Sequence, residues 1–422
     1  MLARFLSIMS AGSSSNFTNV NNNGNLTNNN SYNSNGVVPD SLPRTQQSFC
    51  DNNSVEKEIR PCGESPKRSH DASYLEGRSS YQHGSFSLVT DPYSLLLAYY
   101  RCREGVAWKR SVQNYEKHLL RNISESIKTL EGGGKVSRGF YHFTLRERGK
   151  VRDISSVHIS ERVVQRSLCD NALVPVLAPS LIYDSGASLD NKGVSFSRRR
   201  VKVHLLRHYR RHGNEGYAVS IDCKKYFASI NHQILFDMLG EKIEDKQVLN
   251  LTKMYIKDFG EKGLGLGSQV SQICSVFFLH KIDHYAKEVL GLENYARYMD
   301  DSYFIVKTKE EAKKFLDLLR KKYKEFDLEF NENKTQIVKL TRGFIFLKSR
   351  YRLTKDGRIV VTPSPDSRLR MIRKLRKFKK MGKTLEEAKE LYIPWRIDWI
   401  KKGGNPIPSD IAFVNIFARR AT

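Results

Sequence analysis

Three aspartates are the residues of this chain best placed to do chemistry. Asp222 ends one apolar segment, and Asp300 and Asp301 stand together between two others. An aspartate is costly to bury without a partner, and carboxylate oxygens suit a hard divalent cation. Carboxylates brought to one edge from separate strands match the requirement of two-metal phosphoryl transfer, in which two ions clamp the attacking and leaving oxygens. The Asp300–Asp301 pair alone is equally consistent with an exposed acidic turn; Asp222 favours the metal site.

The segments that flank these acids are typical of strands. Residues 217–222 (YAVSID) predict a β-strand, followed by a helix over about 230–239. The short apolar segments 295–298 (YARY) and 302–306 (SYFIV) are separated by Met-Asp-Asp, which predicts a β-hairpin with the acids at its turn. We therefore expect the three carboxylates at the ends of neighbouring strands.

Helical and strand-like segments alternate along the rest of the chain. Asp91 followed by Pro92 predicts the start of a helix, whose apolar spacing ends at Gly105. Strand-like sequence covers 139–157, and the chain is very basic and helical after Val360. Further helices are predicted over 111–130, 161–173 and 309–324. The pattern predicts a mixed α/β fold with a helical end.

The charge is distributed unevenly. The formal net charge is +26, yet residues 1–90 carry seven basic and seven acidic side chains, so the whole excess lies in residues 91–422. Lys and Arg that neutralise phosphates bind nucleic acid without regard to sequence, so RNA or DNA is the favoured partner. Charge alone leaves a ribosomal-type or membrane-surface protein as the alternative. No segment has the roughly 20 apolar residues that cross a bilayer, so no membrane-spanning segment is expected.

The cysteines and the N-terminal region say little about chemistry. The six cysteines form no CxxC pair and have no histidine at zinc-ligand spacing, which disfavours a zinc site or a disulfide framework and suggests a reducing, cytoplasmic setting. Residues 12 to about 90 are rich in Asn, Ser and Gly without a sustained period, so we expect them to be disordered.

Four motifs in this order resemble those of the reverse transcriptases. They are Asp222-x3-Tyr226-Phe227, the Gly-rich segment 263–272, the YMDD sequence at 298–301, and Lys334. The resemblance covers about residues 91–400. It implies an RNA-directed DNA polymerase of α/β (α+β) right-hand fold, with an antiparallel palm sheet and a small helical thumb. The implied division is a disordered leader over 1–90, fingers over 91–215, palm over 216–350 and thumb over 351–422.

The resemblance also implies roles for individual residues. The metal ligands would be Asp222, Asp300 and Asp301 for two Mg²⁺ ions, with Mn²⁺ also compatible, and Lys334 would be a general acid toward pyrophosphate. Phe227 would be a steric gate against ribonucleotides. The other implied contacts are Lys150, Arg152 and Gln272 with the dNTP, and Gly267, Ser271 and Tyr298 with template or primer.

Several of these residues also have plainer interpretations. Taken alone, Phe227 could be a core residue at a turn, but the other motifs favour the steric gate. Lys334 alone would be a surface lysine, and Lys150 with Arg152 could form a solvated basic hairpin. Residues 343–347 (GFIFL) resemble a primer-grip hairpin or a core strand. The C-terminal region with Trp395 and Trp399 is similar to a thumb that lies along template–primer, or to amphipathic core helices.

The segment GLGLGSQVSQ at 263–272 distinguishes among reverse transcriptases. It ends in Ser271-Gln272, where retroviral and group II intron enzymes have Ser-Pro, and so resembles the enzymes of diversity-generating retroelements. A flexible Gln272 near the forming base pair favours looser base selection, although Gln272 is also suited to begin a helix. The resemblance implies dNTPs, template RNA and an RNA–DNA hybrid as partners, with a small basic accessory protein.

The leader offers a second indication. Residues 16–35 contain 11 Asn in 20 positions, and Asn codons are rich in adenine. Since these retroelements copy a template repeat with mutation at adenines, residues of about 11–42 are either such a repeat read in frame or an ordinary low-complexity tail. Group II intron, retron-type and phage-defence reverse transcriptases remain alternatives, as does a non-catalytic RNA-binding protein.

Overall fold

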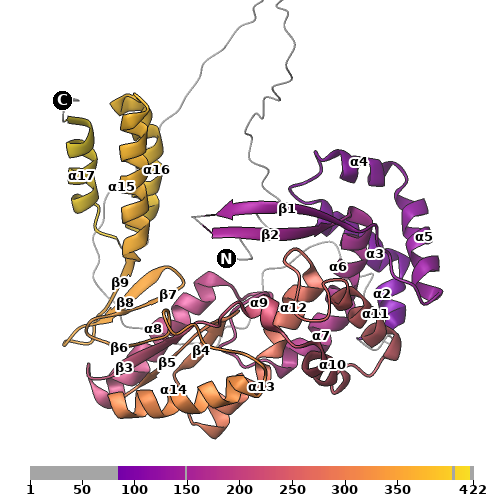
Figure 1. Cartoon of the computed structure of the whole chain (residues 1–422), viewed down its shortest axis with the longest axis horizontal. Helices are drawn as coiled ribbons and strands as arrows, with labels where there is room; N and C mark the ends of the chain where they lie inside the picture. The colour runs from indigo at the N-terminus through magenta and orange to yellow at the C-terminus, as the bar shows by residue number, and fades with distance from the viewer. Residues whose placement is uncertain (1–83, 148–149, 402–403, 419–422) are drawn as a thin grey trace, which may run out of the picture. The chain divides into compact units, whose positions relative to one another are not determined.

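The computed structural model describes residues 84–147, 150–401 and 404–418 (Figure 1). The hypothesis of an in-frame template repeat, and most of the disorder predicted for the leader, therefore lie outside the described residues. Helical structure is already present before Asp91, where ordered sequence was predicted to begin. Helix α2 (Phe86–Thr90) buries Phe86, Leu88 and Val89, so the prediction of disorder was wrong for these residues. Their apolar side chains are covered by the following helices, which local composition does not reveal.

The first long helices follow the sequence signals closely. Helix α3 (Pro92–Arg103) begins as predicted, because the Asp91 side chain accepts a hydrogen bond from the Ser94 amide. The single helix expected over 111–130 is instead two, α4 (Arg110–Lys117) and α5 (Leu119–Glu131). The backbone leaves the helical region at His118, where the Asn122 side chain donates to the Tyr115 carbonyl.

Strands β1 (Phe140–Glu147) and β2 (Lys150–Val157) form the expected antiparallel hairpin, with Leu145 opposite Arg152. Beyond it, the helix expected over 161–173 is α6 (Ile159–Leu168), extended by the π-helical turn η2 (Cys169–Leu173). The short helices α7 (Val174–Leu177) and η3 (Ala178–Ser180) lead to a loop and then to the long helix α8 (Val194–His212).

A four-stranded sheet in the order β4-β5-β3-β6 is the centre of the fold, and each of its pairs is antiparallel. Its strands are β3 (Tyr217–Ile221), β4 (Tyr295–Tyr298), β5 (Asp301–Val306) and β6 (Gln336–Lys339). Alternate residues of β5 pack into different clusters, Phe304 with residues of α14 (Lys309–Lys324) and Tyr303 with residues of α8. The predicted antiparallel sheet is therefore confirmed, with a helix on each face.

The helices around the sheet begin and end at clear signals. Helix α14 (Lys309–Lys324) has the predicted bounds. Its start is fixed by a capping box that Thr308 forms with Glu311. Helix α10 (His232–Gly240) starts two residues later than expected, where Asn231 caps it. The remaining helices of this region are α9 (Tyr226–Ser229), α11 (Lys246–Lys257), α12 (Gln269–Phe278), α13 (His280–His284) and the π-helical η4 (Tyr285–Val289).

The boundary expected at residue 351, between the palm and the helical thumb, does not coincide with the start of the C-terminal helices. That boundary cuts strand β8 (Ser349–Leu353), which pairs with β7 (Phe344–Phe346) and β9 (Ile359–Pro363). Residues 349–353 have the alternating burial of a strand, since Tyr351 and Leu353 are buried while Arg350 and Arg352 are exposed. The helical part begins only at Pro365.

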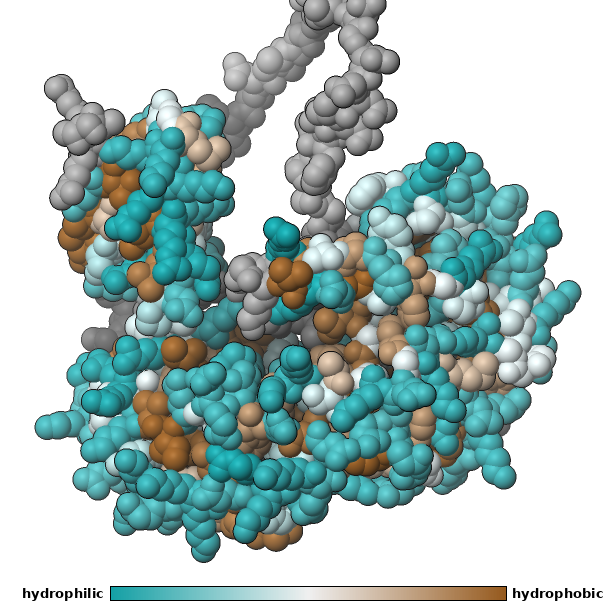
Figure 2. Space-filling model, viewed as in Figure 1, coloured by the Kyte–Doolittle hydropathy of each residue, from teal (hydrophilic) through white to brown (hydrophobic). Residues whose placement is uncertain are grey.

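Three helices follow, α15 (Pro365–Lys380), α16 (Leu385–Lys401) and α17 (Ile407–Ala418), around a small core of their own. Trp399 is buried there and Trp395 packs against it, so both rings belong to the helix packing. Figure 2 shows apolar residues on the surface of these helices. Ile397 and Ile411 are among the exposed apolar side chains of α16 and α17. Within the described part of the chain, no helix combines the length and hydrophobicity that a membrane span requires.

Candidate active site

The antiparallel sheet brings the three predicted aspartates together. Asp222 directly follows β3, Asp300 lies in the turn between β4 and β5, and Asp301 is the first residue of β5. Each offers a carboxylate oxygen, and these oxygens lie within 4.8 Å of one another. All three side chains are half-buried. The strand register brings these distant positions together, because β3 pairs with β5 along its whole length.

The electrostatics of this cluster suit a divalent cation. Burial, together with the charges of Asp300 and Asp222, raises the pKa of Asp301 to about 7. The ammonium of Lys334 lies 2.7 and 2.8 Å from the two carboxylate oxygens of Asp222 and provides the nearby positive charge. The three crowded carboxylates repel one another, and hard oxygen ligands are those that Mg²⁺ and Mn²⁺ prefer. The residues present therefore fit the predicted metal site, whose occupation stays a prediction.

The turn that carries the acids is held by a residue that the sequence analysis missed. Arg297 is fully buried, and its guanidinium forms an ion pair with the fully buried Asp283 at 2.6 Å. The same guanidinium donates to the Met299 carbonyl at 2.9 Å and to the Val276 carbonyl at 2.9 Å. Met299 has a φ of 58°, an uncommon conformation for a side-chain-bearing residue. An arginine inside the apolar strand YARY was the signal that could have identified this role.

The Gly-rich segment contacts the β1–β2 hairpin through its backbone. The Ser155 amide donates to the Leu266 carbonyl at 3.2 Å. Gly267 has a φ of +123°, and a Cβ there would lie 2.7 Å from the Ser155 carbonyl oxygen. The predicted template contact of Gly267 stays a prediction; the structure shows that glycine is needed for this close approach.

The first turn of α12 carries Ser271 and Gln272. Ser268 caps the helix, and its hydroxyl donates to the buried Gln165 amide oxygen at 3.0 Å, which ties α12 to α6. The Ser271 side chain is buried, whereas Gln272 is half-buried and donates from Nε2 to the Ser188 hydroxyl at 2.7 Å. Gln165 and Ser188 were not identified from the sequence, and neither position carried a distinguishing pattern.

The aromatic candidates differ in exposure. Phe227 is half-buried and packs against both large core clusters, while its carbonyl accepts from the Leu264 amide at 2.7 Å. Tyr298 is buried, which raises the pKa of its hydroxyl. The Tyr298 side chain packs in the core beside Met299. Its contact with template or primer stays a prediction, and the burial of the side chain does not favour it.

The basic residues expected to hold the triphosphate lie on β2. Arg152 is half-buried and shares a face of the strand with Ile154, the side chain that approaches Gly267. The side chain of Lys150 lies outside the described residues. The strand proposed as a primer grip alternates: Phe344 and Phe346 are buried against Tyr303, and Ile345 is exposed. One face of this strand is thus core, and the other is available to a ligand.

Comparisons with known proteins agree with these motifs. The family model described as "Reverse transcriptase (RNA-dependent DNA polymerase)" matches residues 142–383. No curated protein matches the sequence. Among solved structures, telomerase from Candida albicans in complex with a TWJ fragment of telomeric RNA has a TM-score of 0.42 and 12% identity, over 66% of this chain and 59% of that chain. Truncated apo telomerase from Candida tropicalis has a TM-score of 0.39 and 13% identity, over 53% and 55%.

The family match spans the elements that build the site. It includes β2 with Arg152, the three aspartates, the Gly-rich segment and Lys334. This chain covers less than two thirds of either telomerase chain, and the similarity to them is too low to bear on activity. Because the family model matches more than half of the 422 residues, the chain belongs to the reverse transcriptase family.

Proposed function

We propose that this protein is an RNA-directed DNA polymerase that extends a primer by nucleotidyl transfer with two divalent cations. The observation that supports this most strongly is the cluster of Asp222, Asp300 and Asp301, whose carboxylate oxygens lie within 4.8 Å at the end of an antiparallel sheet. These residues would hold two Mg²⁺ or Mn²⁺ ions. When bound, such ions lower the pKa of a primer 3′-hydroxyl and stabilise the charge of the triphosphate.

Lys334 has two roles in this proposal. Its ammonium balances the charge of Asp222, to which both hydrogen bonds are shorter than 3 Å. The side chain is half-exposed, so it can turn toward a departing pyrophosphate and donate a proton to it. Arg152, together with Lys150, would bind the triphosphate from β2.

Phe227 would select deoxyribonucleotides. Its backbone is fixed by the Leu264 amide, and its ring is only partly covered by the two core clusters. A rigid ring beside the sugar would collide with a 2′-hydroxyl. A Phe227→Val variant is expected to admit ribonucleotides while retaining dNTP incorporation, which separates the gate from a purely structural role.

The partners follow from charge. The excess of basic side chains lies in residues 91–422, where an RNA template and an RNA–DNA hybrid would be bound through their phosphates. We further propose that the enzyme serves a diversity-generating retroelement and makes errors at template adenines, on the basis of Ser271-Gln272. A small basic accessory protein would help it to engage a structured template RNA, in a cytoplasmic setting.

Primer extension on an RNA template, with sequencing of the products, tests these proposals together. We expect dNTP-dependent extension that requires Mg²⁺ or Mn²⁺, with errors concentrated at adenines. Extension with errors spread evenly over the four bases would leave the polymerase and reject the retroelement assignment. RNA binding without extension would support a non-catalytic RNA-binding protein instead.

A further inference from the structure

The loop between η3 and α8 brings Ser188 to the boundary between α12 and the catalytic turn. The Gln272 side chain donates from Nε2 to the Ser188 hydroxyl oxygen at 2.7 Å. The same hydroxyl donates to the thioether sulfur of Met299 at 3.9 Å. Ser188 thus links the residue that distinguishes this Gly-rich segment to the residue that precedes Asp300.

The directions of these two hydrogen bonds are mutually consistent with the chemistry of the three groups. A thioether has no proton and can only accept, so the single hydroxyl proton of Ser188 points to Met299. The remaining lone pairs of the hydroxyl oxygen accept, and only the NH₂ end of the Gln272 amide can donate to them. The carbonyl end of the Gln272 amide is therefore directed away from Ser188. The hydrogen bond to Ser188 therefore holds the half-buried Gln272 amide in one orientation, with its carbonyl oxygen facing away from Ser188.

Ser188 itself is held by a rigid loop. The Gly193 amide donates to the Gly186 carbonyl at 2.7 Å, which closes the loop at its base, and the Gly186 amide donates to the Arg297 carbonyl at 2.9 Å. A Cβ on Gly186 would lie 1.9 Å from the Ser197 hydroxyl, so the loop backbone lies directly against α8. The loop is thereby fixed both to the strand that leads to the catalytic turn and to the helix behind it.

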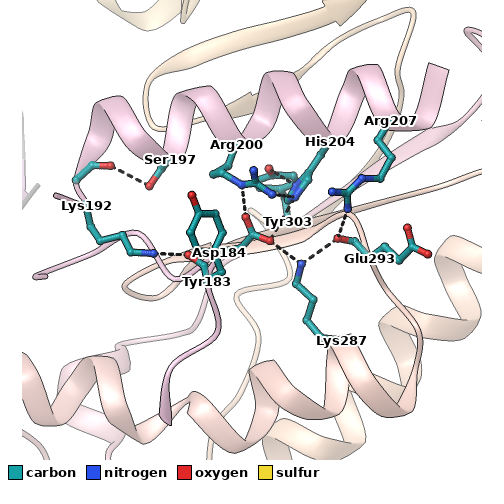
Figure 3. Close-up of polar contacts among 11 residues, drawn as sticks. Tyr183, Asp184, Lys192, Ser197, Arg200, His204, Arg207, Lys287, Glu293 and Tyr303 are labelled. Atoms are coloured by element: carbon teal, nitrogen blue, oxygen red, sulfur yellow. Dashed lines mark hydrogen bonds and ion pairs between the residues drawn. The ribbon is translucent and has the colours of Figure 1, made fainter. Parts of the chain in front are cut away.

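Buried polar contacts anchor the same loop at Asp184 (Figure 3). The Asp184 carboxylate forms ion pairs with Arg200 of α8 and with Lys287 of η4, the latter at 2.6 Å. His204 lies beside Asp184 and shares a hydrogen bond of 2.8 Å with the Tyr303 hydroxyl on β5. These contacts join the loop to the palm sheet and to two helices, so Ser188 has little freedom to move.

We propose that Ser188 is a positioning residue that fixes the Gln272 amide and thereby sets base discrimination during nucleotide addition. This proposal rests on the proposed polymerase function. Ser188 has a φ of 60°, so the chain holds a serine in a left-handed conformation to place its hydroxyl there. The class of ligand affected is the nascent base pair, which Gln272 would face.

Two substitutions separate the effect of the Ser188 hydroxyl from the effect of its backbone conformation. Ser188→Ala removes the hydroxyl and leaves a side chain in a left-handed conformation, whereas Ser188→Gly removes the hydroxyl and relieves that conformation. We expect both to lower discrimination against wrong dNTPs opposite template adenine by about fivefold, the factor that corresponds to one ordinary hydrogen bond. The kcat for the correct dNTP should stay within about twofold, and the matched variant Ser195→Ala, at an exposed serine of α8, should match the wild type.

A double-mutant cycle decides whether Ser188 acts through Gln272. In a Gln272→Ala background, Ser188→Ala should change discrimination no further, because the amide that Ser188 positions is gone. Additive effects of the two substitutions would overturn the proposal while leaving the polymerase intact, and so would unchanged discrimination in both Ser188 variants. If Ser188→Ala lowered discrimination and Ser188→Gly did not, the effect would come from the backbone conformation, and the proposal would also be overturned. A wild-type protein that fails to extend any primer would overturn the proposed function, and this assignment with it.

Discussion

Two antiparallel hairpins carry the two halves of the candidate site, and they are stabilised differently. The β4–β5 hairpin is buried along nearly all of its length and lies within a four-stranded sheet with helices on both faces. The β1–β2 hairpin forms a sheet of two strands and exposes Tyr141 and Val151 by 74% and 61%. Among the described residues, its backbone contacts the Gly-rich segment through a hydrogen bond from the Ser155 amide to the Leu266 carbonyl.

The difference agrees with the proposed roles of the two hairpins, metal binding for β4–β5 and triphosphate binding for β1–β2. Groups that bind metal ions must keep their spacing within fractions of an ångström, and a buried sheet with an internal ion pair provides that rigidity. A hairpin that closes on a triphosphate must move between open and closed forms, and segments with few buried contacts open at low cost. We therefore expect changes in β4–β5 to abolish turnover or to unfold the protein, and changes around β1–β2 to alter the KM for dNTP.

The largest effect is expected for the acids of the palm hairpin. Asp300→Asn removes one carboxylate charge from the cluster, and we expect dNTP incorporation to fall about a thousandfold, because charge stabilisation at the reacting phosphate is lost. RNA binding, measured by filter retention, should stay within about twofold. Asp317→Asn on the exposed side of α14 is the matched control and should retain activity. Unchanged incorporation by Asp300→Asn would show that this cluster does not catalyse nucleotidyl transfer.

The buried ion pair of the same hairpin should dominate stability. Arg297→Met leaves Asp283 buried and uncompensated, so the free energy of unfolding in urea should fall by about 3–5 kcal/mol. Arg211→Met breaks an ion pair with Glu293 in which both side chains are more than half exposed, and should cost less than about 1 kcal/mol. Similar losses in the two variants would mean that the palm hairpin is not distinguished by its buried pair.

The elements around the acids could be predicted because their signals are local. The extent of α14 follows from its amphipathic pattern, the start of α3 from Asp91 and Pro92, and the β4–β5 hairpin from two apolar segments around two acids. The reverse transcriptase motifs then implied the antiparallel sheet. Their order along the chain carries information about the fold that no single residue has.

The supports of the site could not be predicted because they depend on contacts between distant segments. Asp283 is 14 positions from Arg297, and Ser188 is 84 positions from Gln272, so no local pattern pairs them. The same holds for α2, which is helical because other helices cover its apolar residues. The strand β8 was not predicted, although Tyr351 and Leu353 alternate with arginines, because five residues with three apolar or small positions give only a weak strand signal.

The crowding of the three acids predicts a pH dependence that the β1–β2 hairpin should not share. The pKa of Asp301 is about 7 in the folded protein and near 3.8 when unfolded, so between these values the folded state holds a proton that the unfolded state has lost. Stability in EDTA should therefore fall as pH rises from about 4 to 7. We expect a loss of about 2 kcal/mol, roughly half of what the pKa difference gives, because the side chain is partly exposed.

Thermal unfolding of the wild type and of Asp301→Asn isolates this contribution, because the other titrating groups are common to both. The difference in Tm should grow with pH in favour of the variant. Mg²⁺ added at pH 7.5 should raise the Tm of the wild type and leave that of Asp301→Asn nearly unchanged. A pH-independent difference between the two proteins would mean that the carboxylates do not interact as their spacing indicates.

The smallest effect is expected where the two halves of the site meet, at Gly267. An alanine there would bring a Cβ within 2.7 Å of the Ser155 carbonyl and push the Gly-rich segment away from β2, so the KM for dNTP should rise about tenfold. Gly133→Ala is a matched control, since Gly133 also has a positive φ but a Cβ would meet nothing within 4 Å. Both variants should lose about 1 kcal/mol of stability from the left-handed backbone, and only Gly267→Ala should alter KM. An equal change of KM in both would show that backbone strain, rather than contact between the Gly-rich segment and the hairpin, governs nucleotide binding.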